Sequence, residues 1–123
     1  MSLALAVGVA GVVGAILRYV ADGAVQDRTS GTFPFGTSVV NLCGSAILGV
    51  VTGLAWYHGL GHAPRVIVGA GFCGAFTTWS TVSWETLRLA EERASAQAVV
   101  HMVGGVAACL AVAGAGLAVA AAL

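Results

Sequence analysis

Uncharged hydrogen-bonding side chains recur at helical spacing inside two long apolar segments of the chain. In the first segment, Thr37, Asn41 and Ser45 follow one another at intervals of four residues, which places them on one face of a helix. A carboxamide such as that of Asn41 is costly in hydrocarbon unless a partner binds it. The stripe therefore indicates either a polar pathway or an interhelical hydrogen bond, and the sequence leaves both interpretations open.

The second apolar segment combines glycines with a run of hydroxyl groups. Its members are Gly69, Gly71, Gly74, Thr77, Thr78, Ser80, Thr81 and Ser83. Glycines favour a break in a membrane helix, and hydroxyls can re-satisfy the backbone groups that a break frees. Carbonyl ends of broken helices bind cations and N-terminal ends attract anions, so we expect an ion site here. The alternative is an unbroken helix whose hydroxyls bond back to the preceding turn.

Two further patterns in the sequence resemble sites but lack the context that such sites need. The three glycines match the GxGxxG form of a dinucleotide-binding loop, which functions only within a strand–turn–helix unit, and apolar helical sequence surrounds them here. His58 and His62 have the spacing of a metal pair. The glycines between them weaken the helix that would align the pair, which favours a solvated turn. We therefore expect no enzymatic activity.

The composition indicates the environment in which these side chains act. Of 123 residues, 59% are hydrophobic and only 8% are charged, whereas about a quarter of an average soluble domain is charged. A soluble domain this small could not cover its surface with so few charges, so the apolar surface must face the lipid bilayer. The formal net charge is zero, which provides no basic face for nucleic acid.

Charged residues divide the chain into apolar runs near the length of about 20 residues that a membrane helix needs. We predict a single four-helix transmembrane domain over residues 1–123, with spans over residues 2–20, 35–57, 65–87 and 95–122. The runs do not alternate as barrel strands do, and their Gly and Ala content suits closely packed helices. The predicted fold is an all-α membrane protein whose third helix is broken at mid-membrane.

Charged residues are expected at the span ends only. Arg18 and Glu85 fall at predicted ends, where we expect their side chains to reach toward the interface. No Lys, Arg, Asp or Glu lies in the middle of a predicted span, which argues against a proton-coupled transporter. His101 lies in the fourth span, near an interface, and the sequence assigns it no role.

Three stretches resemble the signature sequences of the Fluc/CrcB fluoride channels. They are GAILRY at residues 14–19, GTSVVNLCGS at residues 36–45 and GFCGAFTTWST at residues 71–81, in the first three spans in order. The resemblance implies a channel that exports fluoride passively and relieves its toxicity, as a multi-pass protein of the bacterial cell membrane. It also implies an antiparallel, inverted dimer with two fluoride pathways and a structural sodium ion at its centre.

The resemblance assigns roles to individual residues. The backbone carbonyls of Gly74 and Thr77 match the positions that hold the sodium ion, and Arg18 matches a structural arginine at the end of the first helix. Trp79 and Val82 occupy the positions of a phenylalanine pair in the fluoride pathway and so depart from the family pattern. The remaining pathway positions are matched by Asn41, Thr78, Ser80 and Thr81.

The arginines bear on the partner in the dimer. Four spans leave one arginine, Arg65, on one side of the membrane and four on the other: Arg18, Arg28, Arg88 and Arg93. The positive-inside rule then places both termini outside. A homodimer of oppositely inserted copies should show almost no bias, so between a homodimer and a heterodimer we favour a heterodimer with an oppositely oriented paralogue.

Two other functions remain open on the sequence. One is a non-conducting assembly subunit of such a dimer, in which the polar stripes only hold helices together. The other is a small multidrug-resistance-type transporter, which is also a four-helix protein. That class relies on an acidic residue in its first helix, and residues 1–17 contain none.

Overall fold

The computed structural model describes residues 2–123, and all regular structure in that range is helical. The first two spans are α1 (Leu3–Gln26) and α2 (Phe35–Tyr57). The third comprises α3 (His62–Val66), the π-helical η1 (Ile67–Cys73), α4 (Gly74–Phe76) and α5 (Trp79–Glu91). The fourth comprises α6 (Ser95–Val99), the π-helical η2 (Val100–Gly104) and α7 (Gly105–Ala121). All four are long and apolar enough to cross a membrane, which confirms the predicted number.

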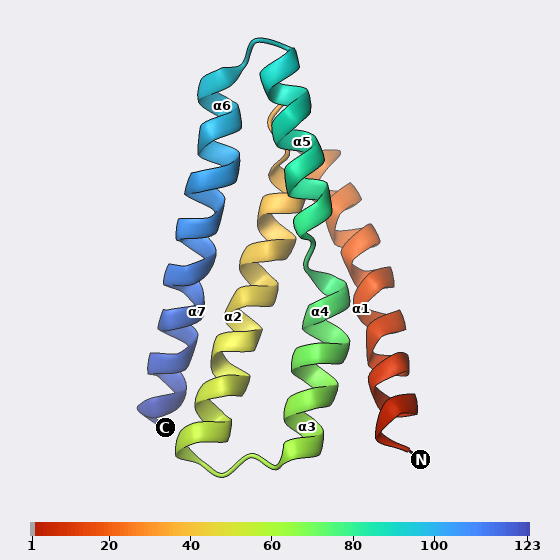
Figure 1. Cartoon of the computed structure of the whole chain (residues 1–123), viewed down its shortest axis with the longest axis vertical. Coiled ribbons are helices and arrows are strands. Elements are labelled where there is room, and N and C mark those ends of the chain that lie inside the picture. Colours follow the sequence, from red (N-terminus) through yellow and green to blue (C-terminus); the bar gives the residue numbers. More distant parts are fainter. Residues whose placement is uncertain (1) are drawn as a thin grey trace.

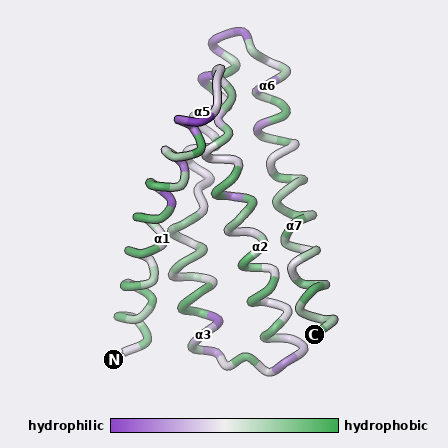
Figure 2. The backbone as a smooth tube through the Cα atoms, turned by 180° about the vertical axis from the view of Figure 1, so that it is seen from behind, coloured by the Kyte–Doolittle hydropathy of each residue, from purple (hydrophilic) through white to green (hydrophobic). Residues whose placement is uncertain are grey.

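The four spans run alternately up and down (Figure 1). Both ends of the chain and the turn between α2 and α3 lie at one end of the bundle, and the other two connections lie at the opposite end (Figure 1). Hydrophilic residues concentrate at these connections, while the long middle of each helix is largely hydrophobic (Figure 2). The arrangement is that of a helical membrane protein.

Two spans run further than their apolar cores predict. The first predicted span ends at residue 20, whereas α1 continues to Gln26. Its last turn is tied to α2, because the Gln26 carboxamide donates to the Phe33 carbonyl (3.4 Å) and accepts from the Gly36 N–H (3.3 Å). Arg18 therefore lies well inside α1 rather than at its end. The third span covers His62–Glu91 and extends past the predicted range of 65–87 at both ends.

Small residues allow the helices to approach closely. A Cβ atom on Gly49 of α2 would overlap the carbonyl oxygen of Ala113 in α7. α1 approaches the third span in the same way, since a Cβ atom on Gly14 would lie 2.5 Å from the Phe72 carbonyl oxygen. Gly49 and Gly53, the GxxxG pair of α2, thus serve packing within the chain.

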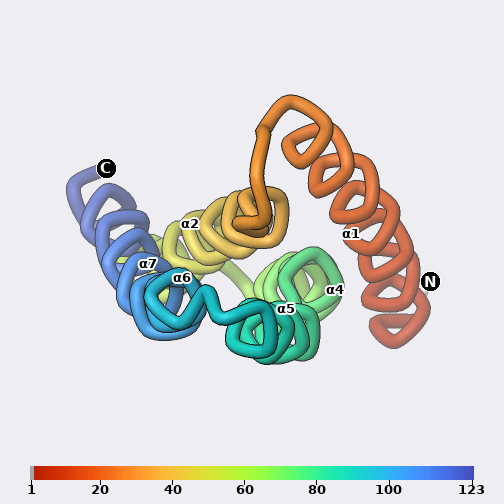
Figure 3. Tube along the Cα trace, turned by 90° about the horizontal axis from the view of Figure 1, so that it is seen from above, coloured from red at the N-terminus to blue at the C-terminus, as the bar shows by residue number. Residues whose placement is uncertain are grey.

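The bundle is open along one side. α7 packs on α2, while α1 packs on η1, α4 and α2. Seen from above, α1 and α7 lie at opposite edges, with α2 and the third span between them (Figure 3). A groove therefore runs between the third span and α7, along one side of α2.

The turn between α2 and α3 holds the two histidines that had the spacing of a metal pair. His58 and His62 are both exposed. The His58 Nε2 lies 2.6 Å from the Ala120 carbonyl oxygen, which links the turn to the end of α7. Within residues 2–123, no group of three or more His, Cys, Asp or Glu side chains could hold a metal ion.

Candidate ion site

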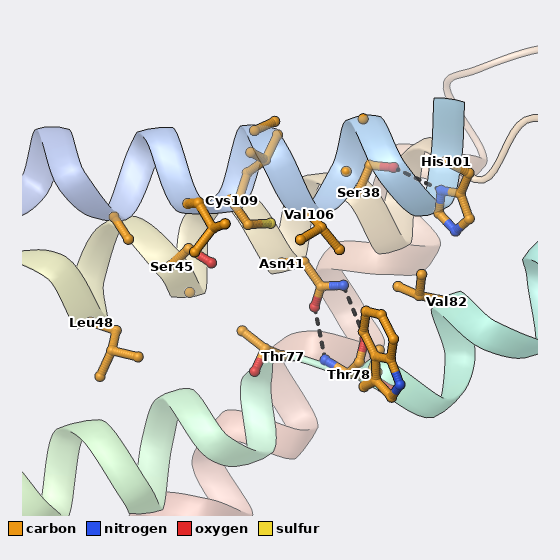
Figure 4. Close-up of a pocket in the computed structure, with 18 of the residues that line it drawn as sticks. Ser38, Asn41, Ser45, Leu48, Thr77, Thr78, Val82, His101, Val106 and Cys109 are labelled. Atoms are coloured by element: carbon orange, nitrogen blue, oxygen red, sulfur yellow. Dashed lines mark hydrogen bonds between the residues drawn. The ribbon is translucent and has the colours of Figure 1, made fainter. Parts of the chain in front are cut away.

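The groove has a volume of about 770 Å³ and is bounded by α2, the third span and the η2–α7 segment. Most of its walls are apolar. The side chains that can form hydrogen bonds include those of Ser38, Asn41, Ser45, Thr77, Thr78 and His101. Figure 4 shows that these residues come from all three walls of the groove. The structure thus brings the polar stripe of α2 to face the hydroxyl-rich segment of the third span.

The backbone leaves helical geometry at the two residues between α4 and α5. Thr77 has φ −91° and ψ 161°, and Thr78 has φ −149° and ψ 128°, so both are extended. Gly74 retains helical dihedral angles, φ −61° and ψ −32°. The Thr78 hydroxyl caps α5, because its Oγ1 accepts a hydrogen bond from the Thr81 N–H at 3.2 Å. The new helix therefore begins with a satisfied N-cap.

The Asn41 carboxamide pairs with the backbone of Thr78 through two hydrogen bonds. Its Nδ2 donates to the Thr78 carbonyl at 3.0 Å, and its Oδ1 accepts from the Thr78 N–H at 2.8 Å (Figure 4). Of the two interpretations of the α2 stripe, the interhelical hydrogen bond is therefore present. The pathway interpretation stays open as well, because Asn41 lines the groove and its Nδ2 has a second hydrogen to donate.

These bonds leave two carbonyl oxygens without their helical partners. The Gly74 carbonyl would accept from the Thr78 N–H four residues on, but that N–H donates to Asn41. The Thr77 carbonyl would accept from the Thr81 N–H, but that N–H donates to the Thr78 hydroxyl. Both Gly74 and Thr77 line the groove. Free carbonyl oxygens are suitable ligands for a hard cation, so the residues present fit a sodium ion.

The other hydroxyls divide between two kinds of bond. Thr77, Ser83 and Thr86 bond back to carbonyls of their own helical turns, at 2.8 Å, 3.0 Å and 2.7 Å, as expected for an ordinary Ser/Thr-rich helix. The hydroxyls of Thr78 and Thr81 instead bond to each other at 3.0 Å at the start of α5. Ser80 Oγ lies 3.3 Å from Thr78 Oγ1 and is exposed.

Some predicted site residues line the groove and others do not. Trp79 and Val82 line it beside Asn41 and Thr78, and the Trp79 side chain is largely exposed. Within the described chain, Ser80, Thr81 and Arg18 are absent from its lining. Arg18 is half-buried and lies on α1, at the opposite edge of the bundle from α7 (Figure 3).

Two aromatic residues that the sequence analysis did not single out also line the groove. Phe33 and Phe35 have ring centroids 4.8 Å apart, and the Phe33 ring meets the His101 ring edge-on at 5.6 Å. Both lie at the His101 end of the groove. Their position on either side of Pro34, at the start of the second span, was the only signal available in the sequence.

The expectation that Glu85 reaches toward the interface is wrong. Its side chain points into the bundle, where Oε1 accepts a hydrogen bond from the Thr37 hydroxyl at 2.9 Å and Oε2 lies 3.1 Å from His101 Nε2. His101 is 2% exposed, and its Nδ1 lies 3.4 Å from Ser38 Oγ (Figure 4). A long polar side chain reaches inward here because the bundle offers buried partners.

Comparison with known proteins adds independent information. Residues 5–117 match the family model described as CrcB-like protein, Camphor Resistance (CrcB). The chain is similar to fluoride-specific ion channel FluC 1 of Leifsonia xyli subsp. xyli, with 46% identity over 92% of this chain and 82% of the relative. It is also similar to fluoride-specific ion channel FluC 2 of Mycolicibacterium paratuberculosis, with 48% identity over 83% of this chain and 82% of the relative. Fluoride-specific ion channel FluC 1 of Streptomyces avermitilis is 45% identical over 85% of each chain.

Proposed function

Because this chain belongs to the CrcB family, we propose that it forms a fluoride-selective channel that exports fluoride passively across the bacterial cell membrane and relieves fluoride toxicity. Its four membrane-spanning helices make it a multi-pass membrane protein. The observation that carries the proposal is the convergence of neutral hydrogen-bond donors on the extended residues Thr77 and Thr78, beside an apolar groove.

Neutral donors suit a small anion that is strongly hydrated. Fluoride must exchange its water for other donors on entering a membrane, because an unpaired charge is very costly there. Asn41 Nδ2, the Ser80 hydroxyl and the first N–H groups of α5 provide such donors without a cationic side chain that would trap the ion. Conduction requires binding that is weak enough for release. The edges of aromatic rings carry positive partial charge, so aromatic side chains that line the groove would add to the attraction of fluoride.

A structural sodium ion is part of the proposal. The carbonyls of Gly74 and Thr77 would hold it, because both are free of their helical partners. When bound, the ion would supply a positive field beside the anion path and would stabilise the interruption of the third span at mid-membrane. The carboxylates of the chain take no part in this site, since neither Gly74 nor Thr77 has an acidic neighbour in the groove lining.

We propose that the working unit is an antiparallel dimer. The groove leaves Gly74 exposed and Thr77 half-exposed, and backbone carbonyls without hydrogen-bond partners cannot face lipid at membrane depth. A second four-helix subunit across the open side would exclude lipid from these groups. The four-to-one distribution of arginines, together with Trp79 and Val82 at positions where the family has phenylalanine, favours a paralogue of opposite orientation as that subunit.

A non-conducting assembly subunit is the second candidate. It is favoured by one observation, that both polar atoms of the Asn41 carboxamide already bond to Thr78. In that case the α2 stripe would serve only to hold the third span, and the partner would supply the pathway.

Fluoride efflux from liposomes tests the proposed function. The complex would be purified through a tag on this chain and reconstituted with internal potassium fluoride and a potassium ionophore. We expect rapid release of fluoride, no release of chloride, and slower fluoride release after exhaustive exchange into sodium-free buffer. Equal release of both anions would contradict selectivity, and full activity and stability without sodium would contradict the sodium site.

Expression of the chain without any paralogue tests the identity of the partner. We expect a monomer or an unstable assembly in detergent, and co-expression with the paralogue should yield a stable heterodimer. Size-exclusion chromatography with light scattering measures both. A stable homodimer that conducts fluoride on its own would exclude the requirement for a paralogue while leaving the channel function intact.

A further inference from the structure

A buried chain of hydrogen bonds separates the groove from a second, smaller pocket. It runs from Thr37 through Glu85 and His101 to Ser38 and joins α2, α5 and η2. His101 and Ser38 line the groove, whereas Glu85 lines the second pocket, which has a volume of about 350 Å³. Neither Glu85 nor His101 has a part in the proposed fluoride site described above.

The donors and acceptors in this row of hydrogen bonds can be counted. Ser38 has one hydroxyl hydrogen, which it donates to the Pro34 carbonyl at 3.1 Å. With that hydroxyl directed at Pro34, the 3.4 Å contact between Nδ1 of His101 and Ser38 Oγ is a hydrogen bond when Nδ1 carries the hydrogen. Between Nε2 of His101 and Oε2 of Glu85, at 3.1 Å, one more proton is needed for a hydrogen bond. Whichever of the two atoms holds that proton, the Glu85–His101 pair has no net charge.

Losing the shared proton changes the charge of the wall that Glu85 and His101 form between the groove and the second pocket. The remaining imidazole hydrogen would bond to the Glu85 carboxylate, and the Ser38 hydroxyl would turn from Pro34 to Nδ1. One hydrogen bond would be lost, and the pair would carry a full negative charge between the two cavities.

No other cation within residues 2–123 neutralises Glu85 at salt-bridge distance, because Arg88 pairs with Glu92 at 3.9 Å instead. Besides Glu85, the charged groups around the second pocket are Asp22 from α1, Asp27 directly after α1, and Arg88 from α5. α2 contributes only the uncharged Thr37 and Ser38 to the chain of hydrogen bonds. With two aspartates and one arginine already there, an ionised and unneutralised Glu85 would make the wall strongly repulsive to an anion.

We propose that Glu85 and His101 share one proton and thereby keep this wall neutral, which makes His101 the positioning residue that allows an anion to pass the Glu85 carboxylate. The inference rests on the proposed fluoride conduction. It predicts that fluoride efflux falls as the pH rises and the shared proton is lost. Even at an effective dielectric constant of about 20, the repulsion energy between a full negative charge and an anion passing near it exceeds thermal energy. We therefore expect fluoride efflux to fall about tenfold.

Fluoride efflux between about pH 5 and pH 8, where histidine ordinarily titrates, tests the proposal. Liposomes without protein report the leak of hydrogen fluoride at each pH. We expect Glu85→Gln to remove the pH step and to raise efflux at the alkaline end. We expect efflux through His101→Gln to be about tenfold below that of wild type at pH values where wild type still holds the shared proton, and to recover in acid. At the alkaline end it should equal that of wild type, because both then carry the Glu85 charge. The double variant, which carries no titratable group at either position, should recover efflux at all pH values.

Thr86→Val is the matched control on α5, because the Thr86 hydroxyl bonds within its own helix to the Val82 carbonyl. It should retain the wild-type pH profile. If His101→Gln does not fold, as judged by size-exclusion chromatography, the Glu85→Gln profile still decides the question. A pH profile that is the same in Glu85→Gln and wild type overturns this inference alone. Absence of wild-type efflux at every pH overturns the proposed function instead.

Discussion

Replacing Asn41 by alanine should reduce fluoride efflux at least about tenfold while the protein remains folded. The change removes both hydrogen bonds to Thr78 and leaves its N–H unpaired, whereas its C=O, as the N-cap carbonyl, keeps the first hydrogen bond of α5. An unpaired group costs about 1–3 kcal/mol, and about 1.4 kcal/mol is a tenfold change in an equilibrium. The extended conformation of Thr78 is therefore expected to become a minor state.

The effect should extend beyond one pathway. If Thr78 returns to helical geometry, its N–H can donate to the Gly74 carbonyl, which is one of the two oxygens proposed to hold sodium. Because that ion is proposed to lie at the centre of the dimer, both pathways would lose its field. The contacts of Gly49 with α7 and of Gly14 with the third span do not involve Asn41, so the four-helix fold of the subunit should persist.

The matched control for this experiment is Thr52→Val. Thr52 lies on the same helix, but its hydroxyl donates to the Leu48 carbonyl of that helix at 2.8 Å, and it does not line the groove. Its efflux should equal that of wild type. Asn41→Asp adds a second comparison, because it retains the acceptor for the Thr78 N–H but loses the Nδ2 donor. Unchanged efflux in Asn41→Ala would support the assembly-subunit alternative.

The sequence predicted the helical elements well where hydrophobicity alone decides them. α2 covers Phe35–Tyr57, as its apolar run and the preceding Pro34 predict. The end of α1 could not be predicted in this way. Asp22, Gly23 and Gln26 interrupt its apolar run, and its last turn is held where Gln26 bonds to Phe33 and Gly36. Those partners lie seven and ten positions further along the chain, beyond the three to four positions that a helical pattern relates.

The candidate site was predicted by residue type but not in its geometry. The third span was expected to be broken between Gly74 and Ser80; within that range Thr77 and Thr78 are extended, while Gly74 itself is helical. The reason is tertiary: Asn41 satisfies the backbone of Thr78, which no propensity of Thr78 itself reveals. The link between Glu85 and His101 also depends on folding, since 16 positions separate them and neither lies in a recognisable motif.

Gly49→Ala should lower the thermal stability of the protein, whereas Gly114→Ala should raise it slightly. Both changes add one methyl group to a glycine inside a helix. Alanine favours helix over glycine by about 0.5–1 kcal/mol, and at Gly114 in α7 nothing within the chain lies within 4 Å of the added Cβ. At Gly49 the added Cβ would overlap the Ala113 carbonyl oxygen and lie 2.9 Å from the Ala113 Cα.

These neighbours of Gly49 are backbone atoms, so they cannot turn aside as a flexible side chain could. α2 and α7 must separate along their contact, and overpacking of this kind costs about 1–3 kcal/mol or more. The loss exceeds the gain in helix propensity, which gives the two variants shifts of opposite sign. Thermal unfolding in detergent, followed by tryptophan fluorescence, measures both. Shifts in the same direction would mean that the close crossing of α2 and α7 does not determine stability, and the α7 wall of the groove would then have to be held from outside the chain.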